Sequence, residues 1–169
     1  VAAYVDKARE QGAKILTGGR AATSEDTNGQ HGTGTTDLGA GVYYLPTIID
    51  GATREMDCVH DEAFGPTVTI ETFTTEEEAI EIANDTEYGL AGAVYTSDAG
   101  RAERVARALR HGTIWINDFH PYLPQAEWGG FKQSGNGREL GPTGLAEYQE
   151  HKHVYQNLSP AAWDQFGLQ

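Results

Sequence analysis

The sequence predicts an α/β fold, a mainly parallel sheet flanked by helices, with an extended strand near the C-terminus. Two observations carry this expectation. Between residues 67 and 117 strand-like and helical periodicities alternate in the order strand, helix, strand, helix, strand. The connections between them are short, which is typical of parallel strands covered by helices. The 169 residues suffice for one domain with a sizeable core.

The chain opens on a helical pattern. Residues 1–12 place Val1, Val5 and Ala8 on one face, and Gly12 is a suitable stop. Because this pattern begins at the first residue and lacks an initiator Met, we expect the chain to be a fragment of a longer protein.

Two strands are expected next, separated by a loop. Residues 13–19 read as a short strand, and residues 42–50 contain another, whose Pro46 favours an edge position or a bend. Residues 21–41 are rich in Gly, Thr and Asp and poor in apolar side chains, so we expect a mobile loop there.

The alternating region begins with a strand over residues 67–73. Thr74 and Glu77 form a predicted capping box for a helix over 75–84. A strand at 89–96, a helix at about 98–110 closed by a glycine, and a strand at 113–117 follow. The inward positions of the two helices are Ala79, Ile82 and Ala83, then Ala102, Val105, Ala106 and Leu109.

The composition excludes several classes of partner. The net charge is −13, from 25 acidic and 12 basic residues, which argues against nucleic acids and anionic membranes. No run of 18 apolar residues predicts a membrane span. The dispersed acidity suggests a salt-loving source, and the single Cys suits a reducing cytoplasm.

Residues 128–141, "WGGFKQSGNGRELG", raise the question of a phosphate-binding loop. A dinucleotide fingerprint needs G-x-G-x-x-G directly after a strand and at the start of a helix. Here the third glycine comes one residue late, at Gly141, and no strand directly precedes the motif. We therefore favour a tight turn that leads into a short helix at "RELG".

Cys58 and His60 are a second candidate pair. On a strand they would point the same way, as a nucleophile and its base. The apolar slot of "MDCV" favours instead a buried thiol that acts as a small hydrophobe. A zinc site formed with His151 and His153 lacks any standard ligand spacing.

Glu62 and Phe64 precede a rigid Gly-Pro turn. A carboxylate can hold the hydroxyls of a ribose while an aromatic ring two residues away packs on the sugar or base. A plain solvated Glu is the alternative.

Five segments together resemble the C-terminal part of an aldehyde dehydrogenase, in the family's order and spacing. They are "DEAFGP" (61–66), "ANDTEYGLAGAVYTSD" (83–98), "GTIWIND" (112–118), "WGGFKQSGNGRELG" (128–141) and "GLAEYQEHKHV" (144–154). The fourth, with "QAE" before it, is similar to the betaine-aldehyde and amino-aldehyde branch.

The resemblance implies roles for individual residues. Glu62 would bind the nicotinamide-side ribose of NAD or NADP, with Phe64 beside the nicotinamide. Leu90 would lie near the nicotinamide and the catalytic thiol, and Trp128 and Tyr122 would line the substrate tunnel. Aromatic faces attract quaternary ammonium groups, although such a tunnel also suits apolar aldehydes. Asp61 departs mildly from the family's Glu, and the glycine-rich turn would be architectural.

The family's nucleophilic Cys, general-base Glu and oxyanion Asn fall upstream of Val1, so the resemblance implies no catalytic residue here and no activity of the chain alone. Residues 1–145 would be part of the catalytic domain and 146–169 a tail that joins a homo-oligomer, dimer or tetramer. Two alternatives remain: a non-enzymatic acidic binding module, which would use loop 21–41, and a Cys/His hydrolase built on an exposed Cys58 with a lowered pKa.

Overall fold

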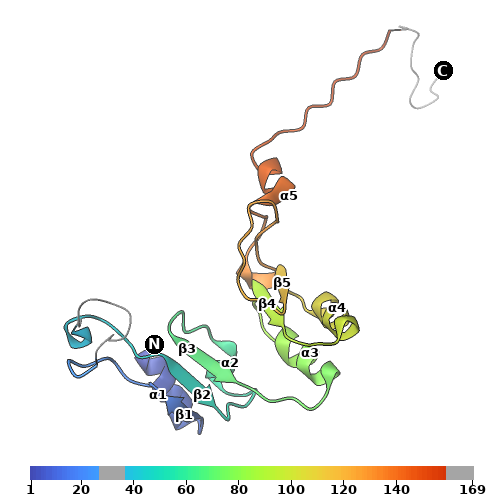
Figure 1. Ribbon diagram of the computed structural model, residues 1–169. Helices are drawn as coiled ribbons and strands as arrows, with labels where there is room; N and C mark the ends of the chain where they lie inside the picture. Colours follow the sequence, from blue (N-terminus) through green and yellow to red (C-terminus); the bar gives the residue numbers. More distant parts are fainter. Residues whose placement is uncertain (27–36, 159–169) are drawn as a thin grey trace, which may run out of the picture.

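The computed structural model describes residues 1–26 and 37–158 (Figure 1). Its architecture is α/β, as predicted, but the strands form two sheets. The first has the order β1-β2-β3 and the second pairs β4 with β5. The bounds are β1 Lys14–Thr17, β2 Thr47–Asp50, β3 Thr67–Ile70, β4 Ala91–Val94 and β5 Thr113–Ile116. The β2–β3 and β4–β5 pairs are parallel, while β1 runs antiparallel to β2.

The first sheet packs against α1 (Ala2–Glu10) and the short helix α2 (Asp57–His60). Val5 and Ile49 are fully buried at the centre of this core. Val1, expected on the same face, is 40% exposed because it precedes the first helical residue. The helix ends as predicted: Gly12 follows it with a φ of +103°, a conformation that suits glycine.

Pro46 lies immediately before β2, which is the central strand of its sheet, so the edge position, one of the two expected alternatives, is wrong. A proline lacks the N–H that a ladder requires, and this one stays outside the ladder. The first donor of the strand is Thr47 N, which donates to the carbonyl oxygen of Pro66 at 2.8 Å. The strand is correspondingly shorter than residues 42–50.

Helix α3 (Glu76–Asn84) begins one residue later than predicted. Its N-cap is Thr75, whose hydroxyl accepts from the N–H of Glu78 at 3.1 Å. The Glu78 carboxylate accepts in return from Thr74 N at 2.7 Å. A capping motif of the predicted kind is therefore present, but Thr75 and Glu78 form it, one residue later than the predicted pair Thr74 and Glu77.

Helix α4 (Ala99–Ala108) is capped by Asp98, which accepts from the N–H of Arg101 at 3.0 Å. Glu76 joins the two helices because it accepts from both Arg101 and Arg104. The two guanidinium groups hold the pKa of Glu76 below its usual value. Helix α4 thus packs on β4 and β5, and α3 packs against α4.

The expected loop at 21–41 is only partly described, since residues 27–36 lie outside the described residues. Arg20 donates two hydrogen bonds to Asp26 at the start of this loop, at 2.7 and 2.8 Å. A single 3₁₀ turn, η1 (Leu38–Ala40), stands at its end.

The last helix, α5 (Gly141–Ala146), includes only the final glycine of "RELG", because Leu140 has a φ of +58° that interrupts a helix. Beyond it the chain leaves the body in an extended conformation (Figure 1). Residues 151–157 form no strand or helix. None of the helices in the described part of the chain is both long and apolar enough to cross a bilayer.

Candidate functional site

Glu62 and Phe64 lie on the loop that joins α2 to β3, and both are exposed. Phe64 is 90% exposed and has a φ of +44°. A bulky residue rarely adopts this left-handed conformation, and such outliers cluster at functional sites. Glu62 makes no hydrogen bond or ion pair with another described residue, so its carboxylate is available to a ligand.

A cavity of about 450 Å³ brings three predicted site residues together. Glu62 and Phe64 line one side of it and Leu90 lines another, with His111 beside it. Glu62 and Phe64 also line a second, wider groove of about 670 Å³, together with residues of β3. The side chains of Glu62 and Phe64 therefore line both the cavity and the groove.

Leu90 is held at its position by backbone hydrogen bonds of its neighbour. The carbonyl oxygen of Gly89 accepts from Gly112 N at 3.0 Å and from Phe131 N at 2.8 Å, and Gly89 N donates to the hydroxyl of Ser134 at 2.9 Å. A Cβ on Gly112 would lie 1.6 Å from the carbonyl oxygen of Gly129, so only glycine fits there. The entry to β4 is thereby tied to the glycine-rich turn.

Leu90 also lines a second cavity, of about 300 Å³, whose wall includes Trp128. Trp128 in turn shares a third cavity, of about 190 Å³, with Tyr122. The rings of Tyr122 and Trp128 meet edge to face, with centroids 5.2 Å apart. We call Trp128 and Tyr122 the aromatic wall. Leu90 lines both the cavity of Glu62 and Phe64 and the cavity that reaches this wall.

The aromatic wall holds three further rings that sequence reasoning missed. Trp115 lies 6.0 Å from Trp128, and His120 lies 5.6 Å from Trp115 and 6.0 Å from Trp128 between ring centroids. Phe119 contacts Trp115 at 5.8 Å. The signal was present in "WINDFHPY", where three aromatic rings and an imidazole fall within eight residues that begin at the end of a strand.

Two carboxylates border the aromatic wall. The Tyr122 hydroxyl donates to Glu139 at 3.4 Å, and Glu127 lines the same cavity as Trp128. Backbone N–H groups and the Thr143 hydroxyl lower the pKa of Glu127, so its carboxylate stays charged. Burial and Glu139 raise the pKa of Tyr122, which keeps its phenol neutral. Negative charge beside aromatic faces favours a cationic ligand.

The glycine-rich turn closes on itself. Trp128 and Glu139 exchange two backbone hydrogen bonds, at 2.8 and 2.7 Å. Arg138 stacks over the ring of Phe131 at 5.4 Å and donates to the carbonyl oxygen of Gly130 at 3.1 Å. These contacts hold the two ends of the turn together and fix the backbone of Trp128.

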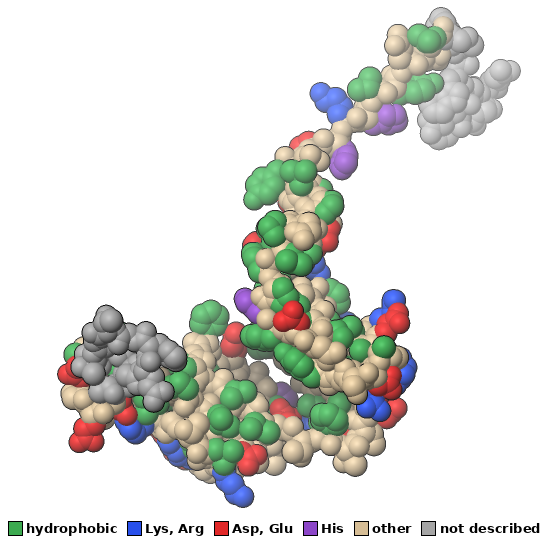
Figure 2. All heavy atoms as spheres, viewed as in Figure 1, with side chains coloured by type: hydrophobic (Ala, Val, Ile, Leu, Met, Phe, Trp, Pro, Cys, Tyr) green, Lys and Arg blue, Asp and Glu red, His purple; other side chains and the backbone are tan. Residues whose placement is uncertain are grey.

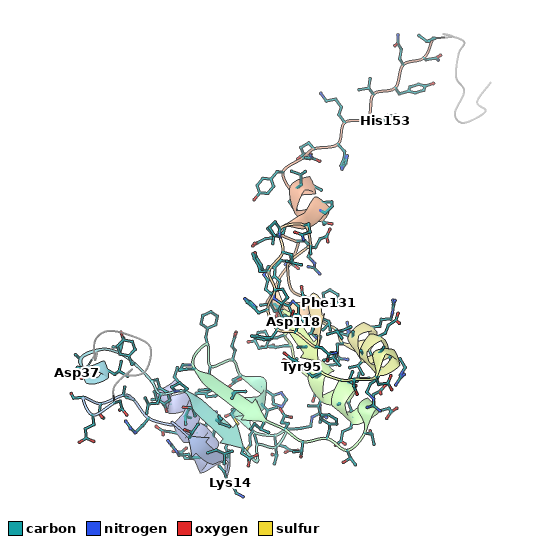
Figure 3. All side chains as sticks on the ribbon, in the orientation of Figure 1. Lys14, Asp37, Tyr95, Asp118, Phe131 and His153 are labelled. Carbon is teal, nitrogen blue, oxygen red and sulfur yellow. The ribbon has the colours of Figure 1, made fainter. Side chains whose placement is uncertain are left out.

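Cys58 is buried, 4% exposed, inside the first core, as predicted. It lies on the helix α2 and not on a strand, so it and His60 face different ways. Burial raises the pKa of the thiol, opposite to what a Cys/His hydrolase requires. His153 lies on the extended tail, away from the body of the molecule that contains α2 (Figures 1 and 3), and His151 precedes it by two residues. The described residues contain no group of three or more metal-binding side chains.

We expect Cys58 to react slowly with thiol reagents. A buried thiol with a raised pKa offers little thiolate at neutral pH, so labelling of the native protein should be at least tenfold slower than labelling in denaturant. Because Cys58 is the single cysteine, the denatured chain is its own control. Equal rates in the two states would contradict the buried assignment.

Comparison with known proteins identifies the family. The model of the aldehyde dehydrogenase family matches residues 1–154. The chain is 54% identical over 163 residues to betaine aldehyde dehydrogenase of Bacillus subtilis (strain 168), covering 96% of this chain and 31% of that protein. It is 44% identical over 160 residues to the peroxisomal aminoaldehyde dehydrogenase 2 of Pisum sativum, covering 95% and 29%.

A crystal structure of betaine aldehyde dehydrogenase from Staphylococcus aureus in complex with NAD+ superposes with a TM-score of 0.87 at 48% identity. The match covers 98% of this chain and 31% of that one, so the chain spans about a third of the length of its relatives. On the extent of these matches, the chain belongs to the aldehyde dehydrogenase family.

Proposed function

We propose that this chain forms one wall of the active site of an NAD(P)-dependent aldehyde dehydrogenase, which oxidises an aldehyde to the carboxylic acid. The carrying observation is the pair of adjoining cavities that meet at Leu90. One is lined by Glu62 and Phe64 and the other by Trp128, so cofactor and aldehyde would approach each other there. NAD is supported by the NAD+ complex of the Staphylococcus aureus relative.

In this proposal Glu62 accepts hydrogen bonds from the hydroxyls of the nicotinamide-side ribose, and Phe64 packs beside the nicotinamide. Charge-assisted hydrogen bonds of this kind fix a ligand's orientation. The cofactor, when bound, supplies a hydride acceptor. Leu90 provides an apolar surface where cofactor and aldehyde meet, which excludes water and keeps the reacting carbons at a near-attack distance. The thiol and the base that complete the reaction belong to the family's upstream segment.

We further propose a cationic aldehyde as the substrate, either betaine aldehyde or a related amino-aldehyde. Trp128 and Tyr122 present aromatic surfaces, and Glu127 and Glu139 add negative charge beside them. The names of the relatives from Bacillus subtilis and Pisum sativum support the same class.

The aromatic wall is tested by Trp128→Ala in the full-length enzyme. We expect KM for betaine aldehyde to rise about 2- to 30-fold more than KM for 3,3-dimethylbutanal, because the second aldehyde has the same shape without the charge and cannot lose a cation–π contact. Steady-state kinetics with both aldehydes measures the difference. Tyr95→Ala, an exposed aromatic residue outside these cavities, is the control. Equal rises for the two aldehydes would contradict a cation-binding role.

The assembly and location are also proposals. We propose that the tail after α5 joins the enzyme into a homo-oligomer that acts in a reducing cytoplasm, in keeping with the single buried Cys. The net charge of −13 fits a salt-rich cell interior, where acidic surfaces keep proteins hydrated.

A further inference from the structure

His111 is a half-buried histidine that none of the roles above uses. It follows α4 and directly precedes the glycine that packs against Gly129, so its backbone is closely fixed. Its ring lines the same cavity as Glu62, Phe64 and Leu90. The Nδ1 atom is buried and has no hydrogen-bond partner among the described residues. A buried imidazole nitrogen without a partner is unusual and calls for an explanation.

The surroundings of His111 determine its protonation. Burial and the nearby ammonium of Lys132 lower its pKa, so the ring is neutral at pH 7. A neutral imidazole carries one N–H and one bare nitrogen. Because an N–H without an acceptor is disfavoured more than an unused lone pair, the proton belongs on Nε2. His111 then offers one uncharged hydrogen-bond donor.

Two hydroxyls of the cavity each accept a hydrogen bond from the backbone, and Gln133, which also lines the cavity, is exposed. The Ser134 hydroxyl accepts from Gly89 N at 2.9 Å, and the Thr86 hydroxyl accepts from Tyr88 N at 3.2 Å. Leu90 and Ala91 contribute apolar surface. His111 therefore supplies a hydrogen-bonding group beside an apolar stretch of wall.

We infer that His111 binds the ring end of the cofactor by donating a hydrogen bond to the carboxamide oxygen of the nicotinamide. This rests on the proposed function, in which the ribose lies at Glu62 and the nicotinamide lies between Phe64 and Leu90. The carboxamide is the one group on a nicotinamide ring that forms conventional hydrogen bonds, and an uncharged donor avoids placing a second positive charge beside the oxidised ring.

The test compares binding of NAD+ with binding of ADP-ribose, which keeps both riboses and lacks the nicotinamide. In the full-length enzyme, His111→Leu should raise the Kd for NAD+ about three- to tenfold, the loss of one neutral hydrogen bond, and leave the Kd for ADP-ribose within about twofold. His111→Gln, which retains a donor, should keep the Kd for NAD+ within about threefold. Calorimetry measures the Kd values and thermal melting checks the fold; His111→Ala replaces the leucine variant if that one does not fold.

Each outcome decides the inference. An unchanged Kd for NAD+ in His111→Leu overturns it. Equal weakening of NAD+ and ADP-ribose also overturns it, because that pattern indicates a structural role. Glu62→Gln serves as the separate check on the proposed function, since it should weaken both ligands. If Glu62→Gln leaves both Kd values unchanged, the ribose assignment fails, whatever the His111 variants do.

Discussion

Glu62→Gln in the full-length enzyme is expected to lower kcat/KM by about tenfold to about 150-fold without lowering the melting temperature. The substitution removes the charge from a hydrogen bond to the ribose, a loss of about 1.5–3 kcal/mol, and lets the nicotinamide leave its reactive orientation. Glu62 is exposed and makes no hydrogen bond with another described residue, so the fold does not depend on it.

Steady-state kinetics with both substrates and a thermal melt test this expectation. Glu77→Gln is the matched control, because Glu77 is also an exposed carboxylate and lies on α3, outside the cavities lined by Glu62. If kcat and the KM for the cofactor both stay at the values of the unmodified enzyme, the ribose assignment is wrong.

Removal of residues 151–169 is expected to dissociate the oligomer. Figure 2 shows hydrophobic side chains along the tail beyond the body of the molecule, among them the exposed Val154, Tyr155 and Leu158. In the described chain this segment does not fold back on its own sheets as a strand, the arrangement that would make it dispensable for assembly. An extended segment with apolar side chains gains most by adding to the sheet edge of a second copy.

Sedimentation or light scattering measures the mass in solution. A chain that ends at Leu158 is the control and should keep the oligomer, because the exposed apolar residues remain. An oligomer of unchanged mass after removal of residues 151–169 would show that assembly uses another surface; aggregation or a smaller particle agrees with the prediction.

Local signals predicted the helices well and the sheets less well. Helix α4 can be predicted from its own residues, because Asp98 caps it and Ala102 and Val105 mark its inner face. Strand β2 cannot: its central place depends on β1 and β3, which lie far from it in sequence. The edge position predicted for the strand after Pro46 is wrong for this reason. A proline that precedes a central strand and a proline in an edge strand cannot be told apart in a single sequence.

The candidate site divides in the same way. Glu62, Phe64, Leu90, Trp128 and Tyr122 were predicted from a family resemblance, and their roles remain predictions. Sequence could not reveal that the first three share a cavity, because that depends on how the two halves of the chain fold together. His111 gave no local signal at all, since a single histidine before a glycine resembles an ordinary surface residue.

Phe64 also bears on how such a chain can be altered. Its backbone has a φ of +44°, which glycine or asparagine would adopt more readily than an aromatic residue. A chain selected for thermal resistance alone would therefore carry one of those residues at this position. Engineering that ranks substitutions by stability will favour replacing Phe64, and would remove the ring proposed to hold the cofactor. Phe64 should therefore be left unchanged when the thermal stability of the enzyme is increased by engineering.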